Sequence, residues 1–269
     1  MPEFAGRGDP RRTMELLWGR TPPAARGPAA ELTPADVVRA AIAVADEEGL
    51  ARLTMRRIAE RLGRSTMSLY TYVPGKPELL DLMLDAIHAE LPTAYDRSGG
   101  WRQAAEAFAR DQWHLLERHP WSLDVAGGRT PLGPHTLDAY EAQLAVFDGL
   151  GLDGVEMTRA VAAVTSFIRG AAQAIHEART AQQATGLSDD DWWNAHAPLL
   201  EEVMDPDWPE RHPTATKLQR AQAFDHADRD TDDPIPYLVV VALDAFEYGL
   251  ARMLDGIAAH IARRGGVPA

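Results

Sequence analysis

Residues 53–76 read LTMRRIAERLGRSTMSLYTYVPGK, and this stretch decides how the amino-terminal part of the chain folds. Thr54 belongs to the residue types that cap a helix amino terminus. The residues after it recur at helical spacing, with Ile58, Ala59 and Leu62 on one face. Gly63 supplies the residue that can turn left-handed where such a helix ends. A short helix is therefore predicted over residues 55–62.

A second short helix follows directly. Ser65 is its cap, Leu69 and Val73 face inward, and Pro74 forces the backbone to extend. The connection Gly63–Ser65 has three residues, which is the spacing of a helix-turn-helix. In that arrangement the second helix enters the DNA major groove and the first lies across the backbone. The stretch is thus a candidate DNA-reading element.

The outward side chains of the second helix suit this task, because hydroxyls bond phosphates or base edges and Met67 can touch a thymine methyl. Arg56 is placed to reach a guanine edge or a phosphate, and Lys76 to clamp a phosphate where the next helix begins. The predicted DNA contacts are Thr54, Arg56, Arg64, Thr66, Met67, Ser68, Tyr70, Thr71, Tyr72 and Lys76.

Two longer helices are predicted on either side. The first begins at the cap Thr33, has Pro34 at its first position and ends at Gly49. The second opens at Lys76-Pro77-Glu78 and carries an apolar stripe as far as Leu91.

Charge is divided unevenly along a chain of 269 residues with a net charge of −13. Residues 1–30 carry +2, residues 31–91 carry −3 and residues 92–269 carry −12, whereas the window 54–77 alone carries +4. This asymmetry predicts a small anion-contacting patch on a larger acidic body, although a solvated helix face also explains many charge runs.

Residues 53–76 resemble the DNA-binding domain of the TetR family of bacterial repressors, and the resemblance covers residues 33–91. The Thr cap, the Ala and Gly, the Leu-Tyr pair, Tyr72 and Lys76 stand at that family's spacing. Arg64 departs from the family, which usually places a small apolar residue in the turn. A bland helical bundle is the alternative.

Further helical patterns lie near residues 101–118, 134–149, 154–180, 190–203 and 235–263, and no convincing strand is found. Acidic, Pro-bearing stretches at 201–213 and 225–236 are interpreted as loops. The expected fold is all-α: a three-helix helix-turn-helix DNA-binding domain with its connecting helix at residues 31–91, and a larger helical domain for ligand binding and dimerisation at 92–269. Residues 1–30, rich in Pro, Gly, Ala and Arg, are interpreted as a flexible basic arm. Its arginines are candidates for minor-groove contacts, and a mere tail is the alternative.

Residues 134–180 and 235–263 are more weakly similar to the regulatory domain of the tetracycline repressor subgroup, through YEAQL at 140–144 and SFIRG at 166–170. The resemblance implies a homodimer formed by two helices per subunit. The apolar circumference of the first helix and small residues on the second agree with this, while burial inside one chain is the alternative. The predicted interface comprises Val161, Val164, Ile168, Ala172, Ala245, Gly249 and Met253.

The resemblance also implies that a small-molecule effector releases the repressor from a palindromic operator by shifting the connecting helix. Candidate pocket residues are Trp113, Trp121, Tyr140, Gln143, Phe147, Phe167 and His176, although core packing explains each equally well. Pro92 stands where the tetracycline repressor begins its coordinating His and partner residues, which argues against tetracycline. The acidic domain weakly favours a neutral or cationic effector.

Other functions have weaker support. The absence of cysteine excludes disulfide scaffolds and thiolate metal sites, and no apolar run is long enough to span a membrane. A cytoplasmic, non-enzymatic protein without cofactor or metal is expected. The run GLGLDG at 149–154 fits a dinucleotide spacing but follows a predicted helix rather than a strand. Two alternatives stay open: a regulator without an effector, and a metal-dependent enzyme that uses the Asp189–His196 region.

Overall fold

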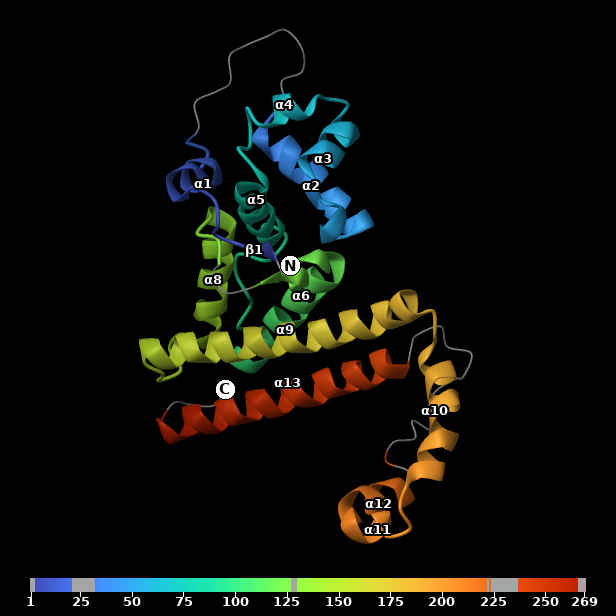
Figure 1. Ribbon diagram of the computed structural model, residues 1–269. Coiled ribbons are helices and arrows are strands. Elements are labelled where there is room, and N and C mark those ends of the chain that lie inside the picture. The colour runs from blue at the N-terminus through green and yellow to red at the C-terminus, as the bar shows by residue number, and fades with distance from the viewer. Residues whose placement is uncertain (1–2, 21–31, 127–129, 222, 224–236, 266–269) are drawn as a thin grey trace. The chain divides into compact units, whose positions relative to one another are not determined.

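The computed structural model describes residues 3–20, 32–126, 130–221, 223 and 237–265, and nearly all regular structure in them is helical (Figure 1). The all-α class is confirmed, although β1 and β2 form a two-residue parallel pair with Glu3 opposite Val125. In chain order the elements are β1 Glu3–Phe4, α1 Pro10–Leu17, α2 Pro34–Glu48, the 3-10 turn η1 Leu50–Arg52, α3 Met55–Leu62, α4 Thr66–Leu69, α5 Lys76–His88, α6 Trp101–Arg118, α7 Trp121–Asp124, β2 Val125–Ala126, α8 Pro134–Phe147, α9 Gly154–Thr185, α10 Asp189–Val203, α11 Trp208–Arg211, α12 Pro213–Arg220 and α13 Tyr237–Arg263.

The chain divides into two compact units, Met1–Gln173 with Glu247–Ala269 and Ala174–Phe246. Helices α9 and α13 each contribute to both units. Residues 31–91 and the first helices that follow them belong to one compact unit. The domain boundaries expected from the sequence therefore remain predictions, because compactness divides the chain elsewhere.

The helices of the amino-terminal region begin and end where capping chemistry predicts. Thr33 and Asp36 form a reciprocal capping box at the start of α2. The Thr54 hydroxyl accepts a hydrogen bond of 3.1 Å from the Arg57 amide at the start of α3. Gly63 ends α3 with φ at 63°, in the left-handed region that glycine adopts without a steric cost.

Helix α4 is shorter than expected. Ser65 caps it, but the helix ends at Leu69, and the amides of Tyr72 and Val73 then both bond the Leu69 carbonyl at 2.9 Å. Pro74 disfavours the helical conformation in the residue before it, so the chain continues as hydrogen-bonded turns. The second element of the helix-turn-helix is one helical turn followed by this tightly bonded exit.

A buried apolar cluster holds α2 to α5 together. Leu53, Ile58, Leu69, Val73 and Leu79 in this cluster are each at most 1% exposed. Each fully buried Leu or Ile contributes on the order of 1.5–3 kcal/mol relative to an exposed one. The same cluster continues into later elements through Leu115, Trp121 and Val125, so this region shares its core with the helices that follow it. The core fixes the orientation of α4.

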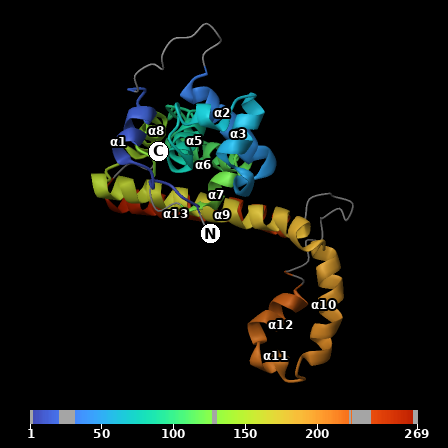
Figure 2. The same cartoon turned by 45° about the horizontal axis from the view of Figure 1, so that its top comes forward.

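The expectation of a flexible arm over residues 1–30 is wrong for residues 3–20. Asp9 caps α1 by accepting a hydrogen bond of 2.8 Å from the Arg12 amide, and Leu16 and Leu17 are buried. Helix α1 lies beside α5 (Figures 1 and 2). The Pro, Gly and Arg content of this region predicts an irregular segment, whereas the Asp9 cap and the apolar Leu16 and Leu17 allow a helix. Residues 21–30 lie outside the described residues.

Two buried acids of α5 bind the backbone of this amino-terminal segment. Asp81 accepts a hydrogen bond of 2.8 Å from the Gly6 amide, and Glu78 accepts one of 3.0 Å from the Asp9 amide. A Cβ on Gly8 would come within 2.5 Å of Glu78 Oε1, so the segment approaches α5 more closely than a larger residue allows. Residues 3–18 are therefore packed against α5 as an integral part of the fold.

The body of the first unit is a helical bundle around aromatic residues. Trp101 of α6 and Phe147 of α8 lie 6.0 Å apart between ring centres, and both are buried with Phe108. The start of α9 meets the end of α13, where Glu156 lies 3.0 Å from His260 Nε2 (Figure 2). A Cβ on Gly249 would come within 2.5 Å of the Phe167 ring, so this glycine admits a neighbour from the same chain.

The second unit contains α10, α11 and α12. The stretch 201–213, interpreted as a loop, holds the end of α10 and the short α11, and α12 begins at Pro213. Its acids form ion pairs rather than prevent helices: Arg211 lies 2.8 Å from Asp205 and 3.5 Å from Asp207. The second predicted loop, 225–236, lies outside the described residues.

Candidate nucleic-acid interface and ligand pocket

The outward face of α4 is available for contact. Met67 is 77% exposed and Tyr70 44% exposed, and Thr71 is exposed beside them. Leu69 and Val73, which alternate with these residues, have no exposed surface. This division confirms that Leu69 and Val73 face the core, and it leaves Met67, Tyr70 and Thr71 as an exposed surface of apolar and hydroxyl groups.

The basic residues of the window 54–77 are partly neutralised by neighbouring acids. Arg57 pairs with Glu48 at 2.7 Å and Arg61 with Glu47 at 2.6 Å, and these hydrogen bonds hold the pKa of both carboxyls below their usual range. Arg56 has an 84% exposed side chain that lies 2.9 Å from Glu60. Arg56 and Arg64, both exposed, are the arginines of this face that can turn to a phosphate or base.

Three predicted contact residues have other partners. Tyr72, expected to project outward or sideways, is half-buried and packs against the core, so it lies sideways rather than outward. The half-buried Ser68 donates its hydroxyl to the Ser65 carbonyl at 2.6 Å, and Thr54 serves as the cap of α3. Thr66 is half-buried at the start of α4.

Lys76, the predicted phosphate clamp, is held by the amino-terminal segment. Its Nζ lies 2.9 Å from Glu3 Oε1, and its side chain is 28% exposed. No local pattern could reveal this ion pair, because 73 residues separate its partners. A phosphate contact by Lys76 has to compete with Glu3.

A polar junction that sequence inspection missed joins α2 to the residues after α6. His119 is 6% exposed, and its ring nitrogens lie 2.8 Å from Asp46 and 2.9 Å from Glu90. Trp121 donates to the same Asp46 carboxylate at 2.7 Å. The buried ring nitrogens of His119 and Trp121 therefore find their hydrogen-bond partners in two acids that stay partly exposed to solvent.

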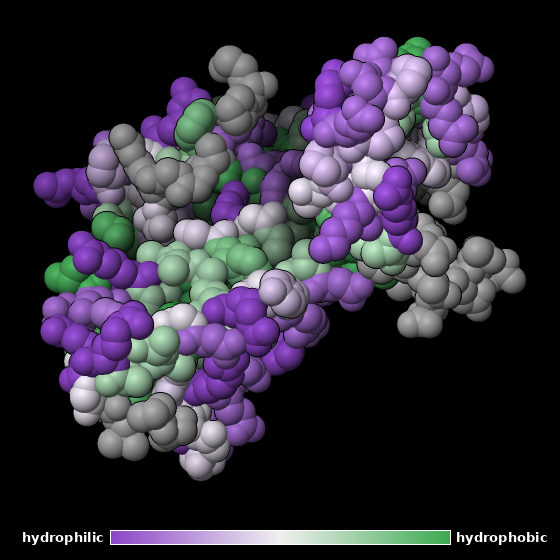
Figure 3. Space-filling model, turned by 90° about the horizontal axis from the view of Figure 1, so that it is seen from below, coloured by the Kyte–Doolittle hydropathy of each residue, from purple (hydrophilic) through white to green (hydrophobic). Residues whose placement is uncertain are grey.

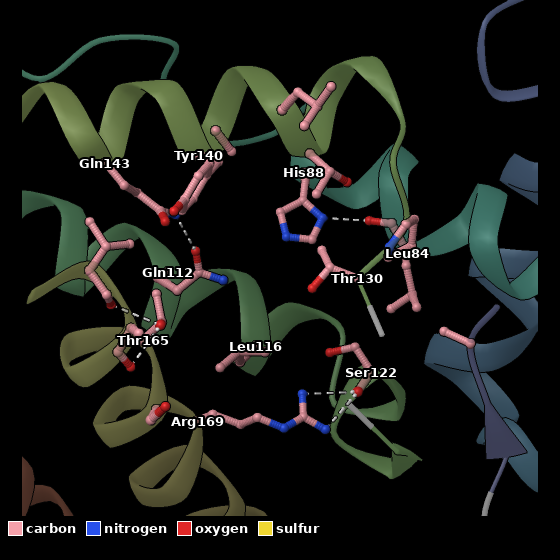
Figure 4. Close-up of a pocket in the computed structure, with 18 of the residues that line it drawn as sticks. Leu84, His88, Gln112, Leu116, Ser122, Thr130, Tyr140, Gln143, Thr165 and Arg169 are labelled. Carbon is pink, nitrogen blue, oxygen red and sulfur yellow. Dashed lines mark hydrogen bonds between the residues drawn. The ribbon is translucent and has the colours of Figure 1, made fainter. Parts of the chain in front are cut away.

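A pocket of about 570 Å³ lies between α5, α6, α8 and α9 (Figure 4). Its polar lining includes His88, Gln112, Ser122, Gln143 and Arg169, and much of the remainder is aliphatic. The Gln143 amide donates to Gln112 at 3.3 Å. The size falls within the roughly 300–1,000 Å³ typical of small-molecule sites.

Of the seven residues predicted for this pocket, Tyr140 and Gln143 line it. Trp113, Trp121 and Phe147 are at most 4% exposed and pack in the core, and Phe167 packs at Gly249. His176 belongs to the second unit. The aromatic residues predicted for the pocket are mostly residues of the core. Ser122, His88 and Arg169 are polar residues that line the pocket, and their common location depends on how separate helices pack.

The predicted dimer residues on α9 are buried within one chain. Val161, Val164, Ile168 and Ala172 are each at most 5% exposed, so they have no surface to offer a partner and this part of the expectation is wrong. Ala245 is exposed, and Gly249 and Met253 are half-buried. The apolar circumference of α9 is used to pack against its own chain.

Other faces of α9 and α13 are exposed and carry small or apolar residues, among them Ala163, Gly170, Tyr248, Gly256 and Ala259. Cβ atoms placed on Gly170 and Gly256 would meet nothing within 4 Å in the described chain. Figure 3 shows a hydrophobic band, bordered by hydrophilic residues, on the side of the molecule where α13 lies.

The alternative metal site has little geometric support among the described side chains, which contain no group of three or more His, Asp or Glu able to hold an ion. His196 bonds the Trp192 carbonyl through Nδ1 at 2.6 Å and stacks on the Trp192 ring. The side chains of Asp189 and Asp190 lie outside the description. None of the described helices combines the length and the apolar character that crossing a membrane requires.

Comparison with known families identifies both halves of the chain. Residues 37–83 match the model of bacterial regulatory proteins of the tetR family, and residues 93–261 match the tetracyclin repressor-like C-terminal domain. A repressor of Streptomyces coeruleorubidus, the HTH-type transcriptional repressor DrrR1, is 42% identical over 98% of this chain and 91% of its own length. The class A tetracycline repressor from transposon 1721 of Escherichia coli is 28% identical over 85% of this chain and 91% of its own.

Solved structures share the fold. ActR from Streptomyces coelicolor, in complex with actinorhodin, superposes with a TM-score of 0.66 at 23% identity and covers 86% of this chain and 97% of its own. The apo form of ActR gives a TM-score of 0.64 at 22% identity, over 86% of this chain and 99% of its own.

Proposed function

The chain belongs to the TetR family of bacterial transcriptional regulators, and from that premise we propose that it is a homodimeric repressor which a small molecule releases from a palindromic operator. The observation that carries the proposal is the division of residues 67–73 between the buried Leu69 and Val73 and the exposed Met67 and Tyr70. A short helix held in this way can enter a major groove without losing its own packing.

Two-fold recognition requires a dimer, because two reading helices about one DNA turn apart match a palindromic site. The exposed faces of α9 and α13, with small residues such as Ala163 and Gly256, are the surfaces we assign to the dimer. Small side chains allow helices of two protomers to approach closely and bury the hydrophobic band. Val161 and its buried neighbours support this face from inside.

The pocket supports response to an effector. Leu84 and His88 of α5 contribute to its wall, and the same helix begins at Lys76, next to the reading element. A ligand that displaces the end of α5 would change the spacing of the two reading heads and lower operator affinity. The complex of ActR with actinorhodin shows that a protein of this fold accommodates a small molecule. The protein would act in the bacterial cytoplasm, without catalytic activity, metal or cofactor.

The test measures operator binding by the full-length protein. The readout is the fluorescence anisotropy of a labelled DNA fragment taken from upstream of the gene that encodes the protein. Tight binding that is weakened in Met67→Ala and in Tyr70→Ala supports the proposal, and binding unchanged in both variants contradicts it. A regulator without an effector would bind the same DNA but show no release and no thermal stabilisation by any compound screened. A saturating ligand at 100 times its dissociation constant stabilises a fold by about 2.7 kcal/mol.

A further inference from the structure

The pocket has an unbalanced charge. Of the described residues that line it, one is an arginine and one is a histidine, and none is Asp, Glu or Lys. The net charge of −13 and the expected preference for neutral or cationic effectors therefore do not apply to this cavity. What a ligand meets there is decided by Arg169, His88 and the groups beside them.

Arg169 is a cation bonded to neutral oxygens. Its Nη2 donates to the carbonyls of Leu123 and Val125 at 2.9 Å each, and Nη1 donates to the Ser122 carbonyl at 3.4 Å. Burial lowers the pKa of its guanidinium, and Asp124 acts against this through space, yet an arginine stays charged in proteins. No carboxylate of the described chain forms an ion pair with it within 4.0 Å, so its charge is only partly compensated.

Ser122 provides a second donor at the same place. The residue is 3% exposed and lines the pocket, and its Oγ has no hydrogen-bond partner among the described residues. Figure 4 shows Ser122 at the end of the extended Arg169 side chain. A buried hydroxyl without a partner is destabilising, and a ligand oxygen that accepts its hydrogen bond removes that cost. A guanidinium and a free hydroxyl together bind an anionic oxygen.

The wall of the pocket formed by α5 favours a different group on the ligand, one that donates a hydrogen bond. His88 Nδ1 lies 2.6 Å from the Leu84 carbonyl, which only accepts, so the hydrogen is on Nδ1 and Nε2 is an acceptor. Burial lowers the pKa of His88, which keeps the ring neutral at physiological pH. An acceptor in this wall favours a ligand that carries a hydroxyl. Leu84, Leu116, Leu137 and Val161 give the space between these groups an apolar lining.

We infer that this pocket selects amphiphilic organic acids, in which an anionic oxygen binds Arg169 and Ser122, an apolar body fills the cavity and a hydroxyl bonds His88. The inference rests on the proposed function, since it names the class of effector that such a regulator senses.

The experiment uses three fluorescent probes with one aromatic body: 1-pyrenebutyrate, 1-pyrenebutanol and 1-pyrenemethylamine. Titration into the full-length protein at neutral pH is expected to give the acid a dissociation constant roughly 10-fold below that of the alcohol, with the amine weakest. Equal affinities, a preference for the amine, or no binding by the acid would each overturn the inference. DNA binding without probe is measured separately, so these results leave the proposed DNA function standing.

Variants locate the preference. Ser122→Ala removes an unpaired hydroxyl and leaves no other group of the protein without a hydrogen-bond partner. We expect it to lower the affinity for the acid by about fivefold and to leave the affinity for the alcohol unchanged. Arg169→Gln should abolish the difference in affinity between the acid and the alcohol, and circular dichroism checks that the helical content of the protein is retained. Arg159→Gln is the matched control, because it removes the same charge from an exposed position of α9. Loss of the preference in Arg159→Gln, or its full retention in both Ser122→Ala and Arg169→Gln, would contradict the assigned site.

Discussion

At the scale of single residues, exposure separates recognition from folding along α4. Met67 and Leu69 stand two positions apart, yet one is 77% exposed and the other has no exposed surface. The difference arises because side chains two apart on a helix do not share a face. The two residues can therefore be tested against each other.

Met67→Ala is expected to weaken operator binding by about 1–2 kcal/mol, since it removes an apolar base contact, and to leave stability within about 0.5 kcal/mol. Leu69→Ala should lower the free energy of unfolding by about 2–5 kcal/mol, because it opens a cavity in the core. Anisotropy and urea unfolding measure the two quantities. A stability loss in Met67→Ala as large as that in Leu69→Ala would contradict the assignment.

Lys76 and Glu3 form an ion pair of 2.9 Å, so we expect substitutions at the two residues to change operator affinity in opposite directions. Lys76→Ala should weaken operator binding and lower the salt slope by about 1. Glu3→Gln frees Lys76 for phosphate, so it should strengthen binding. Glu15→Gln, a second acid of the amino-terminal segment, is the control. Binding unchanged in both Lys76→Ala and Glu3→Gln would remove Lys76 from the interface.

At the scale of elements, the position of α1 depends on buried acids of α5. Burial raises the pKa of Asp81, although the Gly6 amide acts in the opposite direction. The folded state therefore holds a proton on Asp81 at pH values where the unfolded chain has lost it. Its contribution to stability is present below pH 3.8 and is lost as the pH rises through the raised pKa.

Asp81→Asn keeps an acceptor for Gly6 and removes the charge, so it should increase the free energy of unfolding at neutral pH by about 1 kcal/mol. The gain should shrink as the pH approaches 4, which urea unfolding at several pH values measures. The control Asp96→Asn should change stability in the opposite direction, because Ser98 lowers the pKa of that exposed carboxyl. A gain that is independent of pH would show that charge is not the cause.

Capping chemistry and apolar spacing predicted the helices well, and the exceptions have local causes. Thr33, Thr54, Ser65 and Gly63 each act at the end that the sequence assigned to them. Helix α1 was missed because its eight residues carry two arginines and lie in a Pro- and Gly-rich context. Its stability comes from contacts with α5, and no local pattern contains those contacts.

At the scale of the whole molecule, dimerisation has to use the surfaces that one chain leaves exposed. Gly170→Arg places a charged side chain on the open face of α9, where a Cβ meets nothing within 4 Å. We expect the dimer to dissociate and operator affinity to fall by a hundredfold or more, since only paired reading heads span a palindrome. Light scattering and anisotropy measure both effects. Ala145→Arg, at an exposed position of α8, is the control, and a dimer that survives Gly170→Arg would place the interface elsewhere.

The sequence by itself determined the all-α class, the helix-turn-helix, its inward Leu69 and Val73, and the exposure of Met67, Tyr70 and Thr71. These follow from interactions between residues a few positions apart, which a linear pattern records completely. Only the tertiary structure decided that Glu3 holds Lys76, that Val161 and Ile168 are buried in their own chain, and that Ser122 and Arg169 share a pocket with His88. Those contacts join residues far apart in sequence, and their geometry depends on how whole helices pack.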